Sequence, residues 1–236
     1  MANLSFSDWT GIITFFSGWI LFLLKVLYDR VDKFFLKINQ WKSWLSNQTS
    51  LWDLDIEYTG RLSSVILKEI DSIVKKNFQS YSSVYSSHNS LHLLVDGINI
   101  NSRLTEETER VDGSIIYFSN LNIDFKDIRA SFRETKSLIE RIVSVLNSID
   151  DRIKSVNKID NKKYSATIKF KKNNPYFGLY VKRLKLKNID SFTCVFDVSP
   201  TIEDSDKVLI GKDNICIASK KLTSFQSLSL KYLALS

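Results

Sequence analysis

A long apolar run lies close to the N-terminus. Trp9 to Leu24 is a stretch of sixteen residues without a charged side chain. Extended to Tyr28, it would form a helix of about 30 Å, which matches the hydrocarbon core of a bilayer. Trp9 and Tyr28 stand at its ends like interfacial anchors, and Lys25 would reach the headgroups. The pattern predicts a transmembrane anchor over residues 1–28.

The basic residues beside this run set its predicted orientation. None precedes it, and five follow closely: Lys25, Arg30, Lys33, Lys37 and Lys42. The positive-inside rule therefore predicts a single-pass protein of the inner (plasma) membrane, with its N-terminus outside and its C-terminal domain in the cytoplasm. Two alternatives are a cleaved signal peptide, which the lack of an N-terminal basic region disfavours, and a buried helix of a globular domain.

Small residues fall on one face of the predicted anchor. Gly11, Thr14 and Gly18 follow the spacing i, i+3 and i+7, which lets membrane helices approach closely. The stripe predicts self-association and hence a homo-oligomer. Alternatively it carries no information, because such residues are common in membrane helices.

The apolar period continues beyond the run. Spacings of four and three residues alternate along Leu27, Val31, Phe34, Ile38, Trp41 and Leu45. Such a heptad seam is typical of a coiled coil. It predicts one uninterrupted helix from Asp8 to Ser46 that projects from the membrane. The alternative is a break near Asp29, with the second half of the helix lying flat on the bilayer.

The central part of the chain alternates between helical and extended patterns. Residues 47–58 break the heptad and predict a connector, and residues 79–90, rich in serine and tyrosine, predict a loop. Between them, the apolar face of residues 59–78 predicts an amphipathic helix. Asp96-Gly97 and Asp112-Gly113 predict hairpin turns, with a helical turn between them and a strand after the second.

A second long helix and a group of strands occupy the rest of the chain. Phe125 to Val156 keeps a three–four apolar spacing, which predicts a helix that is buried in the core or, alternatively, forms an oligomer seam. A closing amphipathic helix is predicted from Leu222 onward. Period-two patterns predict strands over 164–172, 178–187, 191–198, 207–210 and 214–219.

These elements predict an α+β fold. An N-terminal single transmembrane helix continues into a long juxtamembrane helix, followed by a cytoplasmic domain of amphipathic helices and a C-terminal antiparallel β-sheet. The predicted regions are an anchor, a juxtamembrane helix with its connector, a helix-rich region with a short hairpin, and a β-rich domain with a C-terminal helix: 1–28, 29–52, 53–160 and 161–236.

The positive charge of the chain is concentrated in one segment. The whole chain has 33 basic and 26 acidic residues, a net charge of +7. Residues 154–187 alone hold eleven basic side chains and one acidic side chain. If 164–172 and 178–187 pair as strands, their cations form two rows on one face, and a bound anion would relieve the repulsion between the rows. The predicted anion-binding residues are Lys169, Lys171, Lys172, Lys182, Arg183, Lys185 and Lys187.

Three anionic ligands fit such a surface: a nucleotide signal, the backbone of a nucleic acid, and an anionic lipid leaflet. Lysine outnumbers arginine, which favours general charge attraction over bidentate recognition. The alternative is an edge hairpin whose lysines only prevent aggregation.

The sequence contains no recognisable catalytic motif. No phosphate loop, zinc-protease motif, nucleophile elbow or dinucleotide fingerprint occurs. The residues that could carry chemistry have ordinary explanations as loop histidines, buried strand cysteines and solvated acid pairs: His88, His92, Cys194, Cys216, Asp53/Asp55 and Asp150/Asp151. We therefore predict no catalytic residue, no metal, no cofactor and no enzyme activity.

Two functions fit these features. The first is an oligomeric, membrane-anchored sensor or effector that binds an anionic nucleotide signal or a nucleic acid, a layout shared by membrane effectors of bacterial anti-phage defence. The second is a non-enzymatic anchor or scaffold that docks a partner protein at the inner membrane. The expected partners are the lipid bilayer, further copies of the chain, and either the anion or the partner protein.

Overall fold

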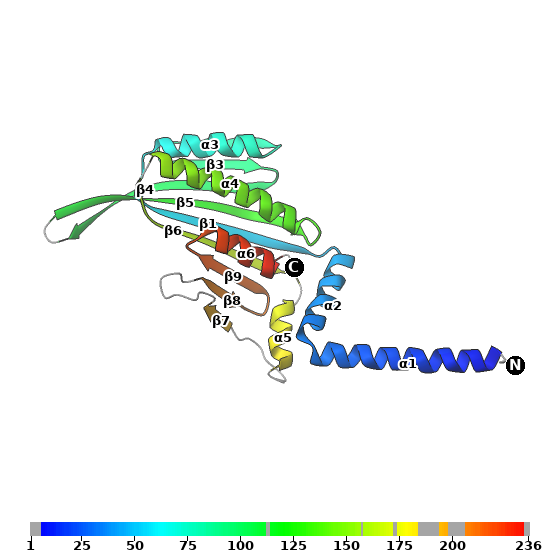
Figure 1. Ribbon diagram of the computed structural model, residues 1–236. Coiled ribbons are helices and arrows are strands. Elements are labelled where there is room, and N and C mark those ends of the chain that lie inside the picture. The colour runs from blue at the N-terminus through cyan, green and yellow to red at the C-terminus, as the bar shows by residue number, and fades with distance from the viewer. Residues whose placement is uncertain are drawn as a thin grey trace.

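One antiparallel β-sheet organises the molecule. The computed structural model describes residues 6–111, 114–156, 158–171, 174–183, 194–197 and 206–233. These residues form nine strands in the order β2-β3-β4-β5-β1-β6-β9-β8-β7 (Figure 1). The strands are β1 (Thr49–Arg61), β2 (Tyr81–Ser86), β3 (Ser90–Val95), β4 (Ile98–Val111), β5 (Ser114–Ser131), β6 (Lys158–Phe170), β7 (Cys194–Asp197), β8 (Lys207–Ile210) and β9 (Asn214–Ser219).

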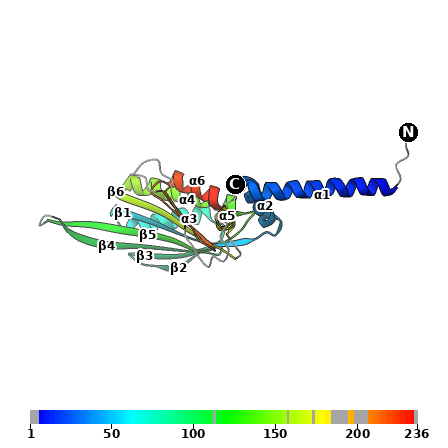
Figure 2. The same ribbon diagram turned by 90° about the horizontal axis from the view of Figure 1, so that it is seen from below.

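The described residues also form six helices. They are α1 (Phe6–Arg30), α2 (Asp32–Leu45), α3 (Val65–Asn77), α4 (Thr135–Val156), α5 (Pro175–Arg183) and α6 (Leu222–Leu233). Helices α3, α4 and α6 lie on one face of the sheet, as Figures 1 and 2 show from two directions. Helix α1 projects from the body, and α2 packs against α5 near the base of α1.

The central strand β1 shows why the two faces of the sheet differ. Successive side chains of a strand point to opposite faces. The buried apolar side chains of β1 therefore share the face beneath the helices: Trp52, Leu54, Ile56 and Tyr58. The acidic side chains between them, Asp53, Asp55 and Glu57, are half-buried or exposed and share the other face. We call this second side of the central strands the polar face.

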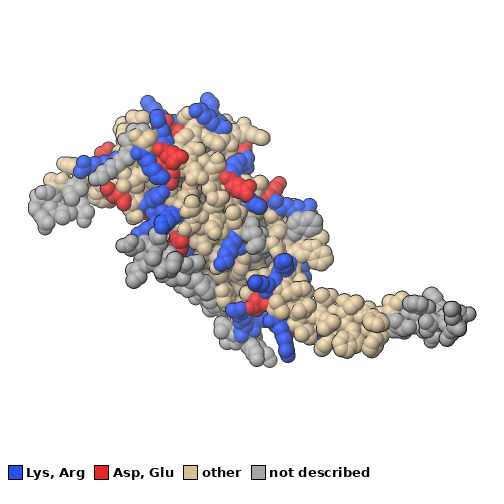
Figure 3. Space-filling view, in the orientation of Figure 1, with Lys and Arg blue, Asp and Glu red and all other residues tan. Residues whose placement is uncertain are grey.

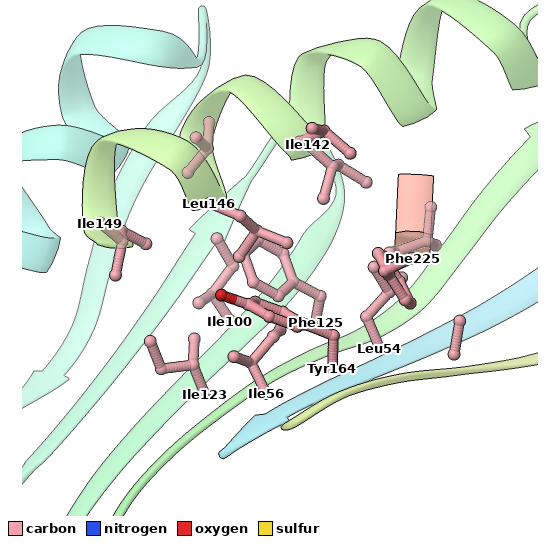
Figure 4. Close-up of a cluster of buried hydrophobic side chains, with 14 of the residues drawn as sticks. Leu54, Ile56, Ile100, Ile123, Phe125, Ile142, Leu146, Ile149, Tyr164 and Phe225 are labelled. Atoms are coloured by element: carbon pink, nitrogen blue, oxygen red, sulfur yellow. The ribbon is translucent and has the colours of Figure 1, made fainter. Parts of the chain in front are cut away.

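The core lies between the sheet and helices α4 and α6. Figure 4 shows side chains of the central strands meeting those of α4, with Phe225 of α6 alongside. Helix α4 presents Ile142, Leu146 and Ile149 to the sheet, each almost fully buried. Full burial of one such side chain stabilises a fold by about 1.5–3 kcal/mol. The prediction that this helix is buried in the core, rather than forming an oligomer seam, is confirmed.

The predicted turn at Asp96-Gly97 is also confirmed. It joins β3 to β4 with Val95 opposite Ile98. Asp96 and Gly97 both have positive φ angles, 47° and 79°, as a two-residue type I′ hairpin turn requires. Strands β4 and β5 likewise pair from Val111 and Ser114, while the turn residues Asp112 and Gly113 lie outside the described residues. The helical turn predicted before them is wrong, because that segment belongs to β4.

Four local predictions are wrong in the type of element. The predicted connector 47–58 contains most of β1, and the predicted loop 79–90 contains β2. The first part of the predicted helix 125–156 is the end of β5, since α4 begins at Thr135. The predicted strand 178–187 is helical as far as Arg183. Strands β1 to β6 thus bring the predicted helix-rich region into the same sheet as the C-terminal strands.

The predicted membrane anchor is not supported. In the part of the chain that the structure describes, no helix has the length and the apolar character needed to cross a membrane. The charge-free run of α1 has sixteen residues between Asp8 and Lys25, fewer than the roughly 20 that a span requires. The structure is α+β with a large antiparallel sheet, but the membrane-anchored fold class, the single-pass topology and the inner-membrane placement are wrong.

The predicted uninterrupted helix from Asp8 to Ser46 is wrong as well. Helix α1 ends at Arg30 and α2 begins at Asp32, and Figure 1 shows α2 running in a different direction from α1. The break lies close to Asp29, where the alternative interpretation placed it.

Candidate functional site

The projecting helix α1 is the most unusual surface of the molecule. Eight of its large apolar side chains are between 49 and 66% exposed: Ile13, Phe15, Phe16, Trp19, Ile20, Leu21, Phe22 and Leu23. An α-helix turns once every 3.6 residues, so the consecutive positions 19–23 cover its whole circumference. In Figure 3 the described part of this projection is tan, without blue or red atoms until its base. Helix α1 is therefore apolar on every side.

Two hydroxyl groups within the charge-free run of α1 do not oppose an apolar contact. The Thr14 hydroxyl donates a hydrogen bond to the Thr10 carbonyl at 2.7 Å, and the Ser17 hydroxyl donates to the Thr14 carbonyl at 2.8 Å. Both hydroxyls are thus satisfied within the helix. A Cβ added at Gly18 would meet no atom within 4 Å, so a neighbouring helix could approach the backbone there.

The base of α1 is a bend with nearly continuous helical hydrogen bonding. The Val31 N–H donates to the Leu27 carbonyl at 2.9 Å, and the Phe35 N–H donates to the Val31 carbonyl at 3.0 Å. Across the bend, the rings of Tyr28 and Phe35 lie 4.9 Å apart between centroids. We call residues 28–35 the α1–α2 junction.

Helix α5 packs against this junction. Phe35 is buried, and a Cβ on Gly178 of α5 would lie 3.7 Å from its ring. The Lys182 ammonium donates to the Tyr28 carbonyl and lies 4.9 and 4.7 Å from the ring centroids of Tyr28 and Phe35. Its neighbour Arg183 forms an ion pair with Asp32. The contacts of α5 therefore fix the direction in which α1 leaves the body.

The predicted anion-binding residues do not form the expected hairpin. Lys182 and Arg183 belong to a helix and contact the α1–α2 junction. Lys169 lies on β6, where its ammonium is 3.6 Å from an Asp53 carboxylate oxygen, and Lys171 is exposed after the end of that strand. Lys172, Lys185 and Lys187 lie outside the described residues. Two rows of paired cations are thus absent from the described segments 158–171 and 174–183.

Two surface hollows are lined by other residues. One, of about 660 Å³, is bordered by the β3–β4 turn and the start of α4, and includes Arg129 and Arg141. The other, of about 1030 Å³, lies beside strands β4 and β5 and includes Glu107 and Tyr117. Neither hollow is lined by a predicted anion-binding residue.

The polar face carries a pair of carboxylates that the sequence pattern concealed. Asp55 of β1 and Asp124 of β5 lie directly opposite each other in the register. Lys126 forms an ion pair with Asp55. Partial burial and a hydrogen bond with Asp55 raise the pKa of Asp124 above its usual range, because two adjacent carboxylates do not both ionise easily.

Asp150 is the residue whose environment was predicted least well. It is 3% exposed and lies between α4 and the sheet. Tyr58 and Tyr164 donate hydrogen bonds to its carboxylate, at 2.5 Å and at 2.6–2.7 Å, and the Lys162 ammonium donates at 2.9 Å. Burial raises the pKa of both tyrosine hydroxyls. The sequence signal that indicates this burial is the position of Asp150 four residues after Leu146, on the apolar side of the helix.

The remaining described residues that could bind a metal or act as a nucleophile do not form a site. Among the described residues, no group of three or more histidine, cysteine, aspartate or glutamate side chains could hold a metal ion. His92 is half-buried on β3, and Cys216 is half-buried on β9 as a free cysteine. The side chain of Cys194 lies outside the described part.

Comparison with models of known protein families gives no match, and no curated protein is significantly similar to the chain. The function must therefore be inferred from the site itself.

Proposed function

We propose that the protein is a non-enzymatic assembly module whose copies associate through α1. The single observation that carries the proposal is the exposure of apolar side chains around the whole circumference of this helix. Exposed apolar surfaces of this extent mark interaction sites, and a helix that is hydrophobic on all sides is normally buried. No face of α1 between Ile13 and Leu24 is covered by another described segment of the chain.

A second copy of α1 is the occupant that its surface suits best. The helix has 25 residues and is about 37 Å long at 1.5 Å per residue, so it offers a contact along several turns. The small residues Gly11, Thr14 and Gly18 lie on one stripe and permit close approach of a like helix. Because the remaining faces are apolar too, more than two copies can pack around a common axis.

Native mass spectrometry of the full-length protein in a mild detergent tests the proposal. We expect a defined oligomer for the wild type. Phe15→Lys combined with Leu21→Lys, at the two most exposed phenylalanine and leucine positions of α1, should raise the dissociation constant at least about a hundredfold, since each change buries a charge in the contact.

Tyr117→Lys is the matched control, because Tyr117 is 69% exposed but belongs to β5. It should leave the oligomer unchanged. A wild type that is monomeric throughout, or an oligomer whose mass is unchanged by the two α1 lysines, would contradict the proposal.

The placement of Lys182 and Arg183 supports a ligand-controlled form of the same function. Both residues were predicted to bind an anion, and both contact the α1–α2 junction. An anion bound there would compete with Asp32 for the Arg183 guanidinium and loosen the junction. A single-stranded hexanucleotide, titrated calorimetrically, serves as a probe.

We expect its affinity to fall with rising salt and to be lost in the Lys182→Glu, Arg183→Glu double variant. Lys207→Glu, at an exposed lysine of β8, is the control. Equal binding to the wild type, the double variant and the control would refute a ligand site on α5.

A further inference from the structure

The β2 end of the sheet is a second uncovered surface. Strand β2 stands last in the strand order, so one of its two backbone edges has no neighbouring strand among the described residues. All of its side chains except Tyr81 are exposed. Val84 and Tyr85 are 56 and 58% exposed. A strand edge of this kind presents a row of unpaired N–H and C=O groups that can pair with another strand.

The composition of this edge is unusual for the chain. From Asn77 to Val95 there are nineteen residues without Asp, Glu, Lys or Arg, in a chain that is 25% charged. Natural edge strands are commonly protected by lysine, proline or an inward-pointing charge. Strand β2 contains none of these. It has only a bulge, where the register with β3 shifts between Ser83 and Tyr85, and this bulge leaves the Val84 side chain exposed.

Two charged groups of α3 contact Tyr81 at the start of β2. The Tyr81 hydroxyl donates a hydrogen bond to Asp71 of α3. The Lys75 ammonium of the same helix lies 5.6 Å from the centroid of the Tyr81 ring. These contacts tie the start of β2 to α3 and hold the strand in place, while its outer edge stays uncharged.

We propose that β2 pairs with β2 of a second copy, antiparallel about a two-fold axis, so that two sheets become continuous. Each copy carries a net charge of +7, and a contact surface free of cations keeps like charges apart, where salt screens their repulsion. Strand β2 and its flanks are such a surface. A two-fold antiparallel pair is self-complementary, since each strand supplies to its twin the donors and acceptors that it receives.

A second copy fits this edge better than an unrelated charged peptide. The pairing would place Val84 and Tyr85 of one strand near Ser83 and Ser82 of its twin, with no like charges opposed. A charged peptide would find no partner for its charges on β2. This contact is separate from the association through α1 and goes beyond it.

Hydrogen exchange of the wild-type chain, followed by mass spectrometry over a range of protein concentrations, tests the pairing without any substitution. We expect those amides of residues 81–86 that point away from β3 to become at least about tenfold more protected as the concentration rises. Amides that exchange equally at all concentrations would overturn the proposal. Protection in a chain of monomeric mass would also overturn it, because β2 would then be covered within its own chain.

Variants separate this contact from that of α1. In the Phe15→Lys, Leu21→Lys background we expect a dimer that becomes monomeric when Ser82→Lys and Val84→Lys are added. Leu94→Lys, at a 40% exposed site on β3, should leave the dimer intact. A monomeric α1 variant with unprotected β2 amides would overturn the β2 pairing while leaving the α1 proposal standing. An α1 variant of unchanged mass whose β2 amides are protected would overturn the α1 proposal while leaving the β2 pairing standing.

Discussion

At the scale of single residues, Asp150 decides how α4 sits on the sheet. Among the described residues it is the only buried charged side chain. Burying an unpaired carboxylate is very unfavourable, but here three donors from two strands offset the lost hydration: Tyr58, Tyr164 and Lys162. Apolar contacts alone would allow α4 to slide along the sheet. The carboxylate ties one position of the helix to one position on β1 and two on β6.

Asp150→Asn should lower the free energy of unfolding by about 3 kcal/mol, because it removes the charge that three donors share and leaves Lys162 without its partner. Urea denaturation followed by circular dichroism measures this loss. Asp151→Asn, at the exposed neighbouring position, should change it by less than about 0.5 kcal/mol. Equal effects of the two changes would mean that the network does not stabilise the fold.

The two buried tyrosines predict a loss of stability in alkali. Burial raises the pKa of Tyr58 and Tyr164 in the folded state, whereas an unfolded tyrosine ionises near pH 10. Above about pH 10 the unfolded chain therefore releases protons that the folded chain keeps, and stability falls as the pH rises further. Each tyrosine contributes about 1.4 kcal/mol per pH unit.

Thermal unfolding between pH 8 and 11 measures this decline. Tyr164→Phe should make it shallower, although the variant is less stable at pH 8 because Asp150 loses a donor. Tyr85→Phe, at an exposed site on β2, should keep the wild-type slope. A Tyr164→Phe profile parallel to that of the wild type would count against this role.

At the scale of secondary structure, the sequence predicted the elements that depend on local geometry. It did not predict the elements that depend on pairing with strands far away in the chain. The β3–β4 hairpin and α4 follow from a turn dipeptide and an apolar period that are complete within the segment. Strand β1 was missed because its acidic side chains fill the polar face of a central strand, which resembles a solvated connector. Its identity depends on pairing with β5 and β6, both far away in sequence.

The candidate site was likewise predicted only in part. The apolar character of α1 was evident from its residues alone, although the membrane interpretation built on it was wrong. The segment from Gly178 to Arg183 alternates well enough to predict a strand, but it forms a helix that packs its apolar side on Phe35 and places Lys182 over two aromatic rings. No local pattern encodes a contact with residues about 150 positions earlier.

The contacts of α5 predict that the α1–α2 junction can be loosened without unfolding the body. Lys182→Ala with Arg183→Ala removes the cation above the rings of Tyr28 and Phe35 and the ion pair to Asp32. Amide exchange over residues 28–36 should accelerate at least about fivefold, since each lost contact contributes about 0.5–1 kcal/mol.

The exchange of amides in β1 should stay unchanged in that double variant. Lys171→Ala, at an exposed lysine of the same predicted cluster, should alter neither segment. Faster exchange throughout the sheet would show that α5 supports the whole fold rather than the junction.

At the scale of the whole molecule, two uncovered surfaces lie on separate elements. Helix α1 leaves the body at the α1–α2 junction (Figure 1), and β2 and β7 stand at the two ends of the strand order. One contact closes a pair and the other gathers several copies, so together they would link oligomers into larger assemblies. In concentrated solution, light scattering of the wild type should then exceed that of either single-surface variant. A variant that scatters as much as the wild type would mean that the surface changed in that variant is not used.

The place of β1 in the sheet also determines when the molecule can fold. The strand lies between β5 and β6, and Ser50 pairs with Phe170, roughly 120 residues later in the chain. A ribosome adding about 5–20 residues per second needs about 6–24 s to make that stretch. During synthesis one edge of β1 therefore stays without its neighbouring strand for many seconds, with the apolar α1 already emerged ahead of it. We expect a chaperone that shields the nascent chain over this interval to raise the yield of folded protein.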